Sequence, residues 1–212
     1  MVSLDCLTCY LIIMGTNQLR KRKIWQDVSG GKAGVAEKKF YEIFLQEFKG
    51  TDFRIRPRPK EFKDIYSKIK LSKKVLADIY TPKGETWTHG VIPDYAIDNI
   101  KTQKTLYVEV KRQDGWVEGK TRSAGRGNAH ERSCKFFTPG LLKILRKHGK
   151  IGKGVLPFWV VFQGDVARDP KRVREITCWY AEYSAHFFMW SNSADGKPLI
   201  NHFNKKLKHL LT

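Results

Sequence analysis

The spacing of apolar side chains predicts helices along much of the chain. The clearest case is residues 34–48, where one face is apolar at intervals of three or four residues, as in an amphipathic helix packed on a core. That face consists of Val35, Phe40, Ile43, Phe44 and Phe48. The same spacing predicts helices over residues 68–80, 129–148, 168–180 and 199–211. We expect the helix over 129–148 to break or kink at Pro139, which has no backbone amide hydrogen to donate.

Three shorter apolar segments, residues 91–97, 105–111 and 156–162, predict β-strands. In the middle one apolar and polar residues alternate, so Leu106, Val108 and Val110 share one face. Tyr107, Glu109 and Lys111 then share the other face. Residues 54–59 contain two prolines, which exclude a helix interior and indicate an extended, basic surface segment. No repeat or long linker is present, so we expect one α/β or α+β domain, a sheet with helices around it.

Charge is the most informative feature of the composition. The 212 residues include 40 Lys and Arg against 21 Asp and Glu, a formal net charge of +19. A hydrophobic content of 41% is typical of a folded soluble protein and excludes a disordered or membrane-spanning chain. The positive excess indicates a polyanionic partner, nucleic acid before an anionic membrane, with generic basicity as the alternative. Four scattered cysteines do not make a disulfide scaffold, so a reducing cytoplasm is expected.

Residues 1–13 form an apolar stretch that is too short to span a bilayer, which takes roughly 20 residues. The basic residues at 20–23 follow it, whereas a signal peptide carries its positive charge first. We therefore interpret residues 1–13 as a dispensable N-terminal extension and residues 14–212 as the functional domain, with no membrane association. The alternative is a short segment that touches a membrane or a partner.

The strongest chemical signal is Asp94 followed by Glu109 and Lys111. Glu109 and Lys111 are two residues apart on a predicted strand, so both side chains leave the same face. A neighbouring strand ending at Asp94 would bring a second carboxylate beside Glu109, and a hard divalent cation such as Mg²⁺ relieves the repulsion between them. The lysine could orient or deprotonate an attacking water and offset phosphate charge. The alternative is that Asp94 is a turn residue and the other two are a solvated strand face.

The residues that follow favour the catalytic interpretation, because Lys111 to Lys135 is rich in Lys and Arg interleaved with glycines. Three segments, residues 112–120 (RQDGWVEGK), 123–135 (SAGRGNAHERSCK) and 157–177, together with the closing 202–204 (HFN), closely resemble the type II restriction endonucleases of the MunI/MfeI type. The resemblance runs from about Met14 to the C-terminus and is weaker over residues 50–90. It does not cover residues 1–13.

This resemblance implies a PD-(D/E)XK restriction-endonuclease-like fold of the EcoRI-like group, with a mixed central sheet flanked by helices. It implies a homodimeric, Mg²⁺-dependent hydrolase of a restriction-modification system that cuts double-stranded DNA at CAATTG, between C and A, leaving 5′ AATT overhangs. A DNA methyltransferase would be its system partner, without a stable complex. Residues 14–212 would then be a single endonuclease domain.

The resemblance also assigns roles to individual residues. Asp94, Glu109 and Lys111 would be catalytic, and Asp94, Glu109 and the carbonyl of Val110 would hold the metal. Arg126 would read the outer C·G pair, since Arg contacts guanine and Asn contacts adenine in the major groove. Other expected DNA contacts are Lys120, Arg122, Gly127, Asn128, Ala129, His130 and Arg132, and Glu37 is a further candidate at the metal. The weaker evidence concerns His130, which either touches a base or simply packs.

Two other functions remain open at this stage. One is a different PD-(D/E)XK nuclease that acts in DNA repair or junction resolution without sequence specificity. The other is a non-enzymatic basic DNA-binding protein, whose binding would be independent of Mg²⁺ and would weaken steeply with salt.

Overall fold

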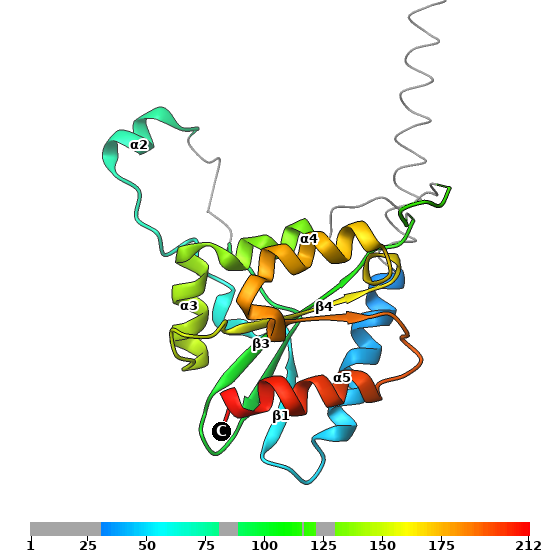
Figure 1. Ribbon diagram of the computed structural model, residues 1–212. Helices are drawn as coiled ribbons and strands as arrows, with labels where there is room; N and C mark the ends of the chain where they lie inside the picture. The colour runs from blue at the N-terminus through cyan, green and yellow to red at the C-terminus, as the bar shows by residue number, and fades with distance from the viewer. Residues whose placement is uncertain (1–30, 81–88, 116, 122–129) are drawn as a thin grey trace, which may run out of the picture.

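Strands from both halves of the chain form one five-stranded mixed sheet in the computed structural model, which describes residues 31–80, 89–115, 117–121 and 130–212 (Figure 1). β1, β2 and β3 pair antiparallel, whereas β3, β4 and β5 pair parallel. The mixed sheet that the resemblance implied is therefore present. In spatial order the strands are β1 (Phe53–Pro57), β2 (Tyr95–Asn99), β3 (Thr105–Arg112), β4 (Phe158–Gln163) and β5 (Phe187–Trp190).

The predicted strands differ from the observed ones mainly at their ends. β3 and β4 lie within two residues of the predicted 105–111 and 156–162. The predicted strand 91–97 was wrong in its start, because regular pairing begins only at Tyr95. The basic segment 54–59 is extended up to Pro57, where it pairs as the edge strand β1, but Arg58 has a positive φ of 43° and departs from the expected extended conformation. Sequence analysis missed β5, whose four residues are too few to show an alternating pattern.

Helices cover the sheet, and several are shorter than predicted. None of the residues of α2 (Lys73–Asp78) is buried. The predicted helix 68–80 was too long, because its apolar residues do not form a core face. The break at Pro139 is confirmed, since a 3-10 helix (Glu131–Phe137) ends there and α3 begins. The closing helix continues from α5 as a π-helical and a 3-10 turn. The α-helices comprise residues 31–47, α2 (Lys73–Asp78), α3 (Pro139–Gly149), α4 (Pro170–Tyr180) and α5 (Lys197–His202).

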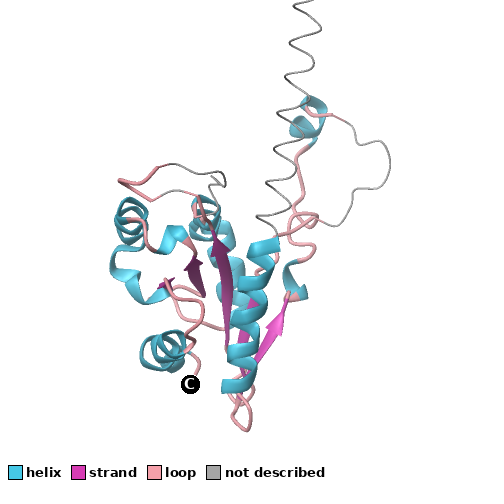
Figure 2. Cartoon of the chain, turned by 90° about the vertical axis from the view of Figure 1, so that its right-hand side faces the viewer, coloured by secondary structure: helices cyan, strands magenta, loops and turns pink. Residues whose placement is uncertain are grey.

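Helices cover both faces of the sheet (Figures 1 and 2). Each face has its own buried hydrophobic cluster. The helix at 31–47 and α5 pack on one face, whereas α3 and α4 pack on the other. β4 serves both clusters, with Trp159 facing the first and Phe158 facing the second, as the alternation of a strand dictates. No helix in the described parts of the chain is long and apolar enough to cross a membrane.

The edge strand β1 is held to β2 by a buried carboxylate. Asp98 accepts hydrogen bonds from Nε of Arg54 at 2.9 Å and Nε of Arg56 at 2.6 Å, and from the Thr105 hydroxyl at 2.7 Å. Burial alone would raise the pKa of Asp98, but the bonds from Arg56, Thr105 and Arg54 outweigh burial and lower it. The arginines of this segment therefore stabilise the sheet.

Asp98→Asn is expected to lower the free energy of unfolding by about 1–3 kcal/mol, because Arg54 loses the carboxylate it pairs with and Arg56 keeps only Glu61. Since the pKa of Asp98 is lowered in the folded state, this stabilisation is full above the unfolded pKa of about 3.9 and is lost as the pH falls below it. Urea unfolding at neutral pH and near pH ~3 measures both effects.

Asp52→Asn is the matched control, because Asp52 pairs with Lys101 at 2.8 Å in an exposed turn. Exposed pairs contribute about 0–1 kcal/mol, so this variant is expected to remain close to the parent protein. Equal losses in the two variants would contradict the structural role of Asp98.

Candidate active site

The adjacent ends of β2 and β3 bring together the acidic residues that the sequence singled out. Tyr95 pairs with Val108 in the antiparallel register, which places Asp94 beside Glu109. Asp94 precedes β2, so the expectation of a strand ending at Asp94 was wrong in direction. The juxtaposition still arises because an antiparallel pair places the start of one strand beside the end of the other.

Backbone hydrogen bonds fix the two carboxylates. Oδ2 of Asp94 accepts from the Val110 amide at 2.8 Å, and Oε2 of Glu109 accepts from the Asp94 amide at 3.3 Å. The carbonyl of Asp94 accepts from the amide of Arg58 at 2.9 Å, which ties the end of β1 to the same place. The positions of the acids are therefore set by the sheet itself.

Lys111 completes the cluster on the same face of β3. Its Nζ lies 2.6 Å from Oε1 of Glu109 and 3.6 Å from Oδ2 of Asp94. Burial opposes the charge of Lys111, but Glu109 and Asp94 outweigh burial and raise its pKa. Lys111 is therefore protonated in this arrangement, which suits orientation and charge stabilisation better than proton abstraction.

Glu109 is buried, and its negative charge is unfavourable in this environment. Its side chain is only 5% exposed. Burial and, secondarily, repulsion from Asp94 raise the pKa of Glu109, although Lys111 partly offsets them. A cation between the two carboxylates would remove the repulsion.

The oxygen atoms at this position fit a divalent metal ion. Besides the two carboxylates, the site contains the carbonyl oxygen of Val110, which lies 3.5 Å from Nζ of Lys111. Hard cations prefer such oxygen ligands and commonly retain several waters. Among the described residues no group of three or more His, Cys, Asp and Glu could hold a metal ion.

Glu37 approaches the same cluster from the helix at 31–47. Its carbonyl accepts a hydrogen bond from the Tyr95 hydroxyl at 2.9 Å, which anchors the helix next to Asp94. Burial raises the pKa of Glu37, and the charge of Asp94 adds to the effect. The structure therefore brings this third carboxylate into the electrostatic environment of the pair.

Sequence reasoning missed Lys135, to which it assigned no role. Nζ of Lys135 lies 3.9 Å from Oε1 of Glu109, although the two residues are far apart in sequence. The 3-10 helix Glu131–Phe137 brings the chain back to β3, so that Lys135 lies near Glu109. The residue lies within the basic run noted in the sequence, but spacing gives no sign of this return.

The predicted DNA-reading residues are only partly described. Lys120 and Arg132 are exposed, Lys120 in a turn and Arg132 in the 3-10 helix after the motif. His130 is buried, with 1% of the residue exposed, which fits the second of its two interpretations, that it packs. The remaining predicted contacts, Arg122, Arg126, Gly127, Asn128 and Ala129, lie outside the described residues.

Basic residues of α4 and its N-terminal approach pair largely with acids. Arg168 lies 2.9 Å from Asp165, and Arg172 lies 2.6 Å from Glu175. Arg174 lies 3.2 Å from Glu118, which belongs to the described segment 117–121. These pairs fit a helix that supports the neighbouring loop more than a row of free phosphate contacts.

Comparison with known proteins gives consistent results over nearly the whole chain. A family model described as Type II restriction enzyme MunI matches residues 14–212. A Mycoplasma sp protein described as Type II restriction enzyme MunI is 51% identical over 201 residues, 93% of this chain and 100% of that protein. A crystal structure of MunI restriction endonuclease in complex with cognate DNA is similar with a TM-score of 0.76 at 51% identity, and the match covers 89% of this chain and 97% of that one.

Proposed function

Because the chain belongs to the MunI family of type II restriction enzymes, we propose that it cuts double-stranded DNA at CAATTG, between C and A, leaving 5′ AATT overhangs. The observation that supports the proposed chemistry is the cluster of Asp94, Glu109 and Lys111. In this cluster Nζ of Lys111 lies 2.6 Å from Oε1 of Glu109 and 3.6 Å from Oδ2 of Asp94. Family membership removes support from the two alternatives, a nuclease without sequence specificity and a non-enzymatic binding protein.

A type II restriction enzyme generally requires a divalent metal, and Mg²⁺ is the ion that best fits the proposed ligands. Asp94, Glu109 and the carbonyl of Val110 would hold it. When bound, the ion would polarise the scissile phosphate and lower the pKa of a bound water. Two carboxylates leave space for water and phosphate oxygen, as Mg²⁺ sites on nucleic-acid substrates require.

The chain's own residues then direct an in-line displacement at phosphorus. Lys111 orients the attacking water and offsets the negative charge that builds up on the phosphate. The new bond joins the water oxygen to phosphorus, and the bond to the 3′ oxygen breaks. The products are a 5′-phosphate and a 3′-hydroxyl, the latter taking up a proton. Glu37 is the further acidic residue proposed to act at this place.

Sequence reading is assigned to the segment that joins Lys120 to the 3-10 helix after the motif. Arg126 is proposed to contact the outer C·G pair, and Asn128 and Arg132 the inner AATT. Gly127 and Ala129 leave room for close approach to the bases, and Lys120 and Arg122 hold the backbone. DNA binding fits the family, since the solved relative is in complex with cognate DNA.

A homodimer is the assembly that a palindrome favours, because twofold symmetry gives each half-site the same reading surface. A DNA methyltransferase of the same specificity would protect the host's own sites without forming a stable complex. Both partners are part of the proposal.

Digestion of unmethylated DNA of known sequence with Mg²⁺, followed by sequencing of the ends, tests this function directly. Discrete fragments with AATT overhangs at CAATTG are expected. Fragments ending at another palindrome would contradict the specificity, and a smear would contradict site-specific cutting.

Arg126→Ala is expected to relax discrimination at the outer base pair. One bidentate contact contributes about 1–3 kcal/mol of discrimination, which corresponds to roughly 5–150-fold in relative cleavage rate. Competitive cleavage of CAATTG and of oligonucleotides changed only at the outer pair measures it. Full discrimination in this variant would assign the outer pair to another residue.

A further inference from the structure

His130 lies within the motif that resembles a base-reading segment, yet its ring is buried at 1% exposure. The ring stacks on Trp179 of α4, with centroids 5.6 Å apart and planes 6° from parallel. An imidazole in this position does not reach a base edge, and its role must be found among the groups that surround it.

The two ring nitrogens face different groups. Nδ1 lies 3.0 Å from Oε1 of Gln113, and the two form a hydrogen bond in the tautomer that protonates Nδ1. Nε2 faces Glu175 at 3.5 Å and Glu131 at 3.8 Å, and makes no hydrogen bond within the described part of the chain. Burial, assisted by the nearby Arg172, lowers the pKa of His130. The ring is therefore neutral at neutral pH.

Gln113 belongs to the extension of the catalytic strand. Its amide donates to the Gln163 carbonyl at 3.1 Å, and its carbonyl accepts from the Val166 amide at 3.1 Å. Close packing here depends on Gly164, where an added Cβ would lie 2.9 Å from the Gln113 carbonyl oxygen. Gln113 is thus held rigidly, two residues beyond Lys111.

The main chain of His130 fixes the segment that follows. Its carbonyl accepts from the Ser133 amide at 3.2 Å and from the Ser133 hydroxyl at 2.6 Å. This turn starts the 3-10 helix that presents Arg132 to solvent and Lys135 to Glu109. His130 therefore connects the start of that helix to the residue that follows β3.

We propose that His130 is a positioning residue that couples base reading to cleavage, by tying the start of the 3-10 helix that carries Arg132 and Lys135 to Gln113, directly after β3. The inference rests on the proposed function, in which residues 126–132 read the site. The ring itself touches neither DNA nor the reacting atoms. Its hydrogen bond sets how the 3-10 helix that carries Lys135 lies relative to Glu109 and Lys111.

His130→Phe tests this coupling, because phenylalanine keeps a flat ring against Trp179 but cannot donate to Gln113. Single-turnover cleavage of the site is expected to fall roughly 10–100-fold, as for a small displacement of groups remote from the reaction. Discrimination against sites with one changed base pair is expected to fall with it. His130→Asn retains a donor near the position of Nδ1 and is expected to restore both to within about threefold.

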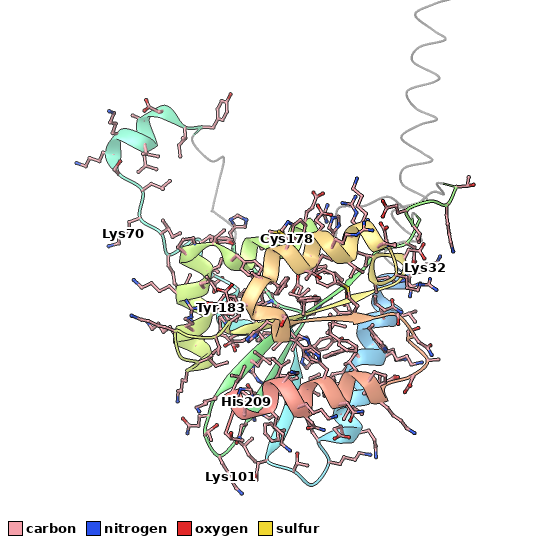
Figure 3. All side chains as sticks on the ribbon, in the orientation of Figure 1. Lys32, Lys70, Lys101, Cys178, Tyr183 and His209 are labelled. Carbon is pink, nitrogen blue, oxygen red and sulfur yellow. The ribbon has the colours of Figure 1, made fainter. Side chains whose placement is uncertain are left out.

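Gln113→Met removes the same bond from its other side and is expected to reproduce His130→Phe. The double variant is expected to be no worse than either single one, because both changes break one contact. This second route keeps the test available if His130→Phe fails to fold. His209→Phe is the matched control, an exposed histidine on the face of the sheet opposite Cys178 of α4 (Figure 3).

Unchanged cleavage and discrimination in His130→Phe and Gln113→Met would overturn the proposal. Equal losses in His130→Phe and His130→Asn, accompanied by a lowered thermal midpoint, would also overturn it in favour of a purely structural role. The target site is first identified by wild-type digestion, so a site other than CAATTG would contradict the proposed specificity without affecting this test.

Discussion

Asp94→Ala is expected to abolish DNA cleavage, lowering the single-turnover rate constant on the order of 10⁴-fold. The variant loses one of the two proposed carboxylate ligands and the acceptor for the Val110 amide at 2.8 Å. Glu109 alone would then have to hold the ion, with Lys111 still paired to it at 2.6 Å. Cleavage of a CAATTG duplex with enzyme in excess and saturating Mg²⁺ measures the effect.

Asp52→Ala is the control for this substitution, because Asp52 is exposed and pairs with Lys101, which lies at the end of the molecule away from α4 (Figure 3). It is expected to cut at the wild-type rate. Cleavage by Asp94→Ala within about tenfold of wild type would show that Asp94 is not part of the catalytic cluster.

Specific binding by the wild type is expected to depend on a divalent metal at neutral pH. Without metal, Asp94 and Glu109 repel the scissile phosphate, and affinity for CAATTG should approach that for unrelated DNA. Specific and non-specific affinities commonly differ by about 10³-fold or more, so the effect is large. Gel-shift titrations with Ca²⁺ and with EDTA measure it, since Ca²⁺ offers charge to the same oxygen ligands.

Two changes should restore specific binding in EDTA. Asp94→Ala removes one of the repelling charges. Acidification protonates Glu109, and because burial and Asp94 raise its pKa, its neutral form is reached at a higher pH than for an ordinary carboxyl group. Binding in EDTA should therefore strengthen as the pH falls. Equal wild-type binding to CAATTG in Ca²⁺ and in EDTA at neutral pH would exclude this electrostatic explanation.

Much of the fold could be predicted because its pattern is local. The alternation in 105–111 predicted β3 and the division of its side chains between two faces, and both are confirmed by the two hydrophobic clusters. Pro139 predicted the start of α3 for a similarly local reason. The prediction of a long helix over 68–80 was wrong, because apolar spacing alone does not reveal whether a core is present to receive that face.

The candidate site depends on the pairing of β2 with β3, and residue spacing predicted that Asp94 and Glu109 would meet but not the register that brings them together. Glu109 and Lys111 were correctly placed on one face, because a strand's period of two is a local property. Asp94 lies beside them through the antiparallel register of β2 and β3. Lys135 and the buried state of His130 depend on the 3-10 helix packing back against β3 and α4, for which the sequence carries no periodic signal.

The sequence by itself determined the positive charge, most of the main secondary-structure elements and the acidic and basic residues of the candidate site, because these follow from composition and from spacing over a few residues. Its family resemblance determined the expected chemistry. Only the tertiary structure decided the charge states and partners of the site residues. Burial and the approach of Lys111, Lys135 and Glu37 are set by segments that are distant in the chain and close in space.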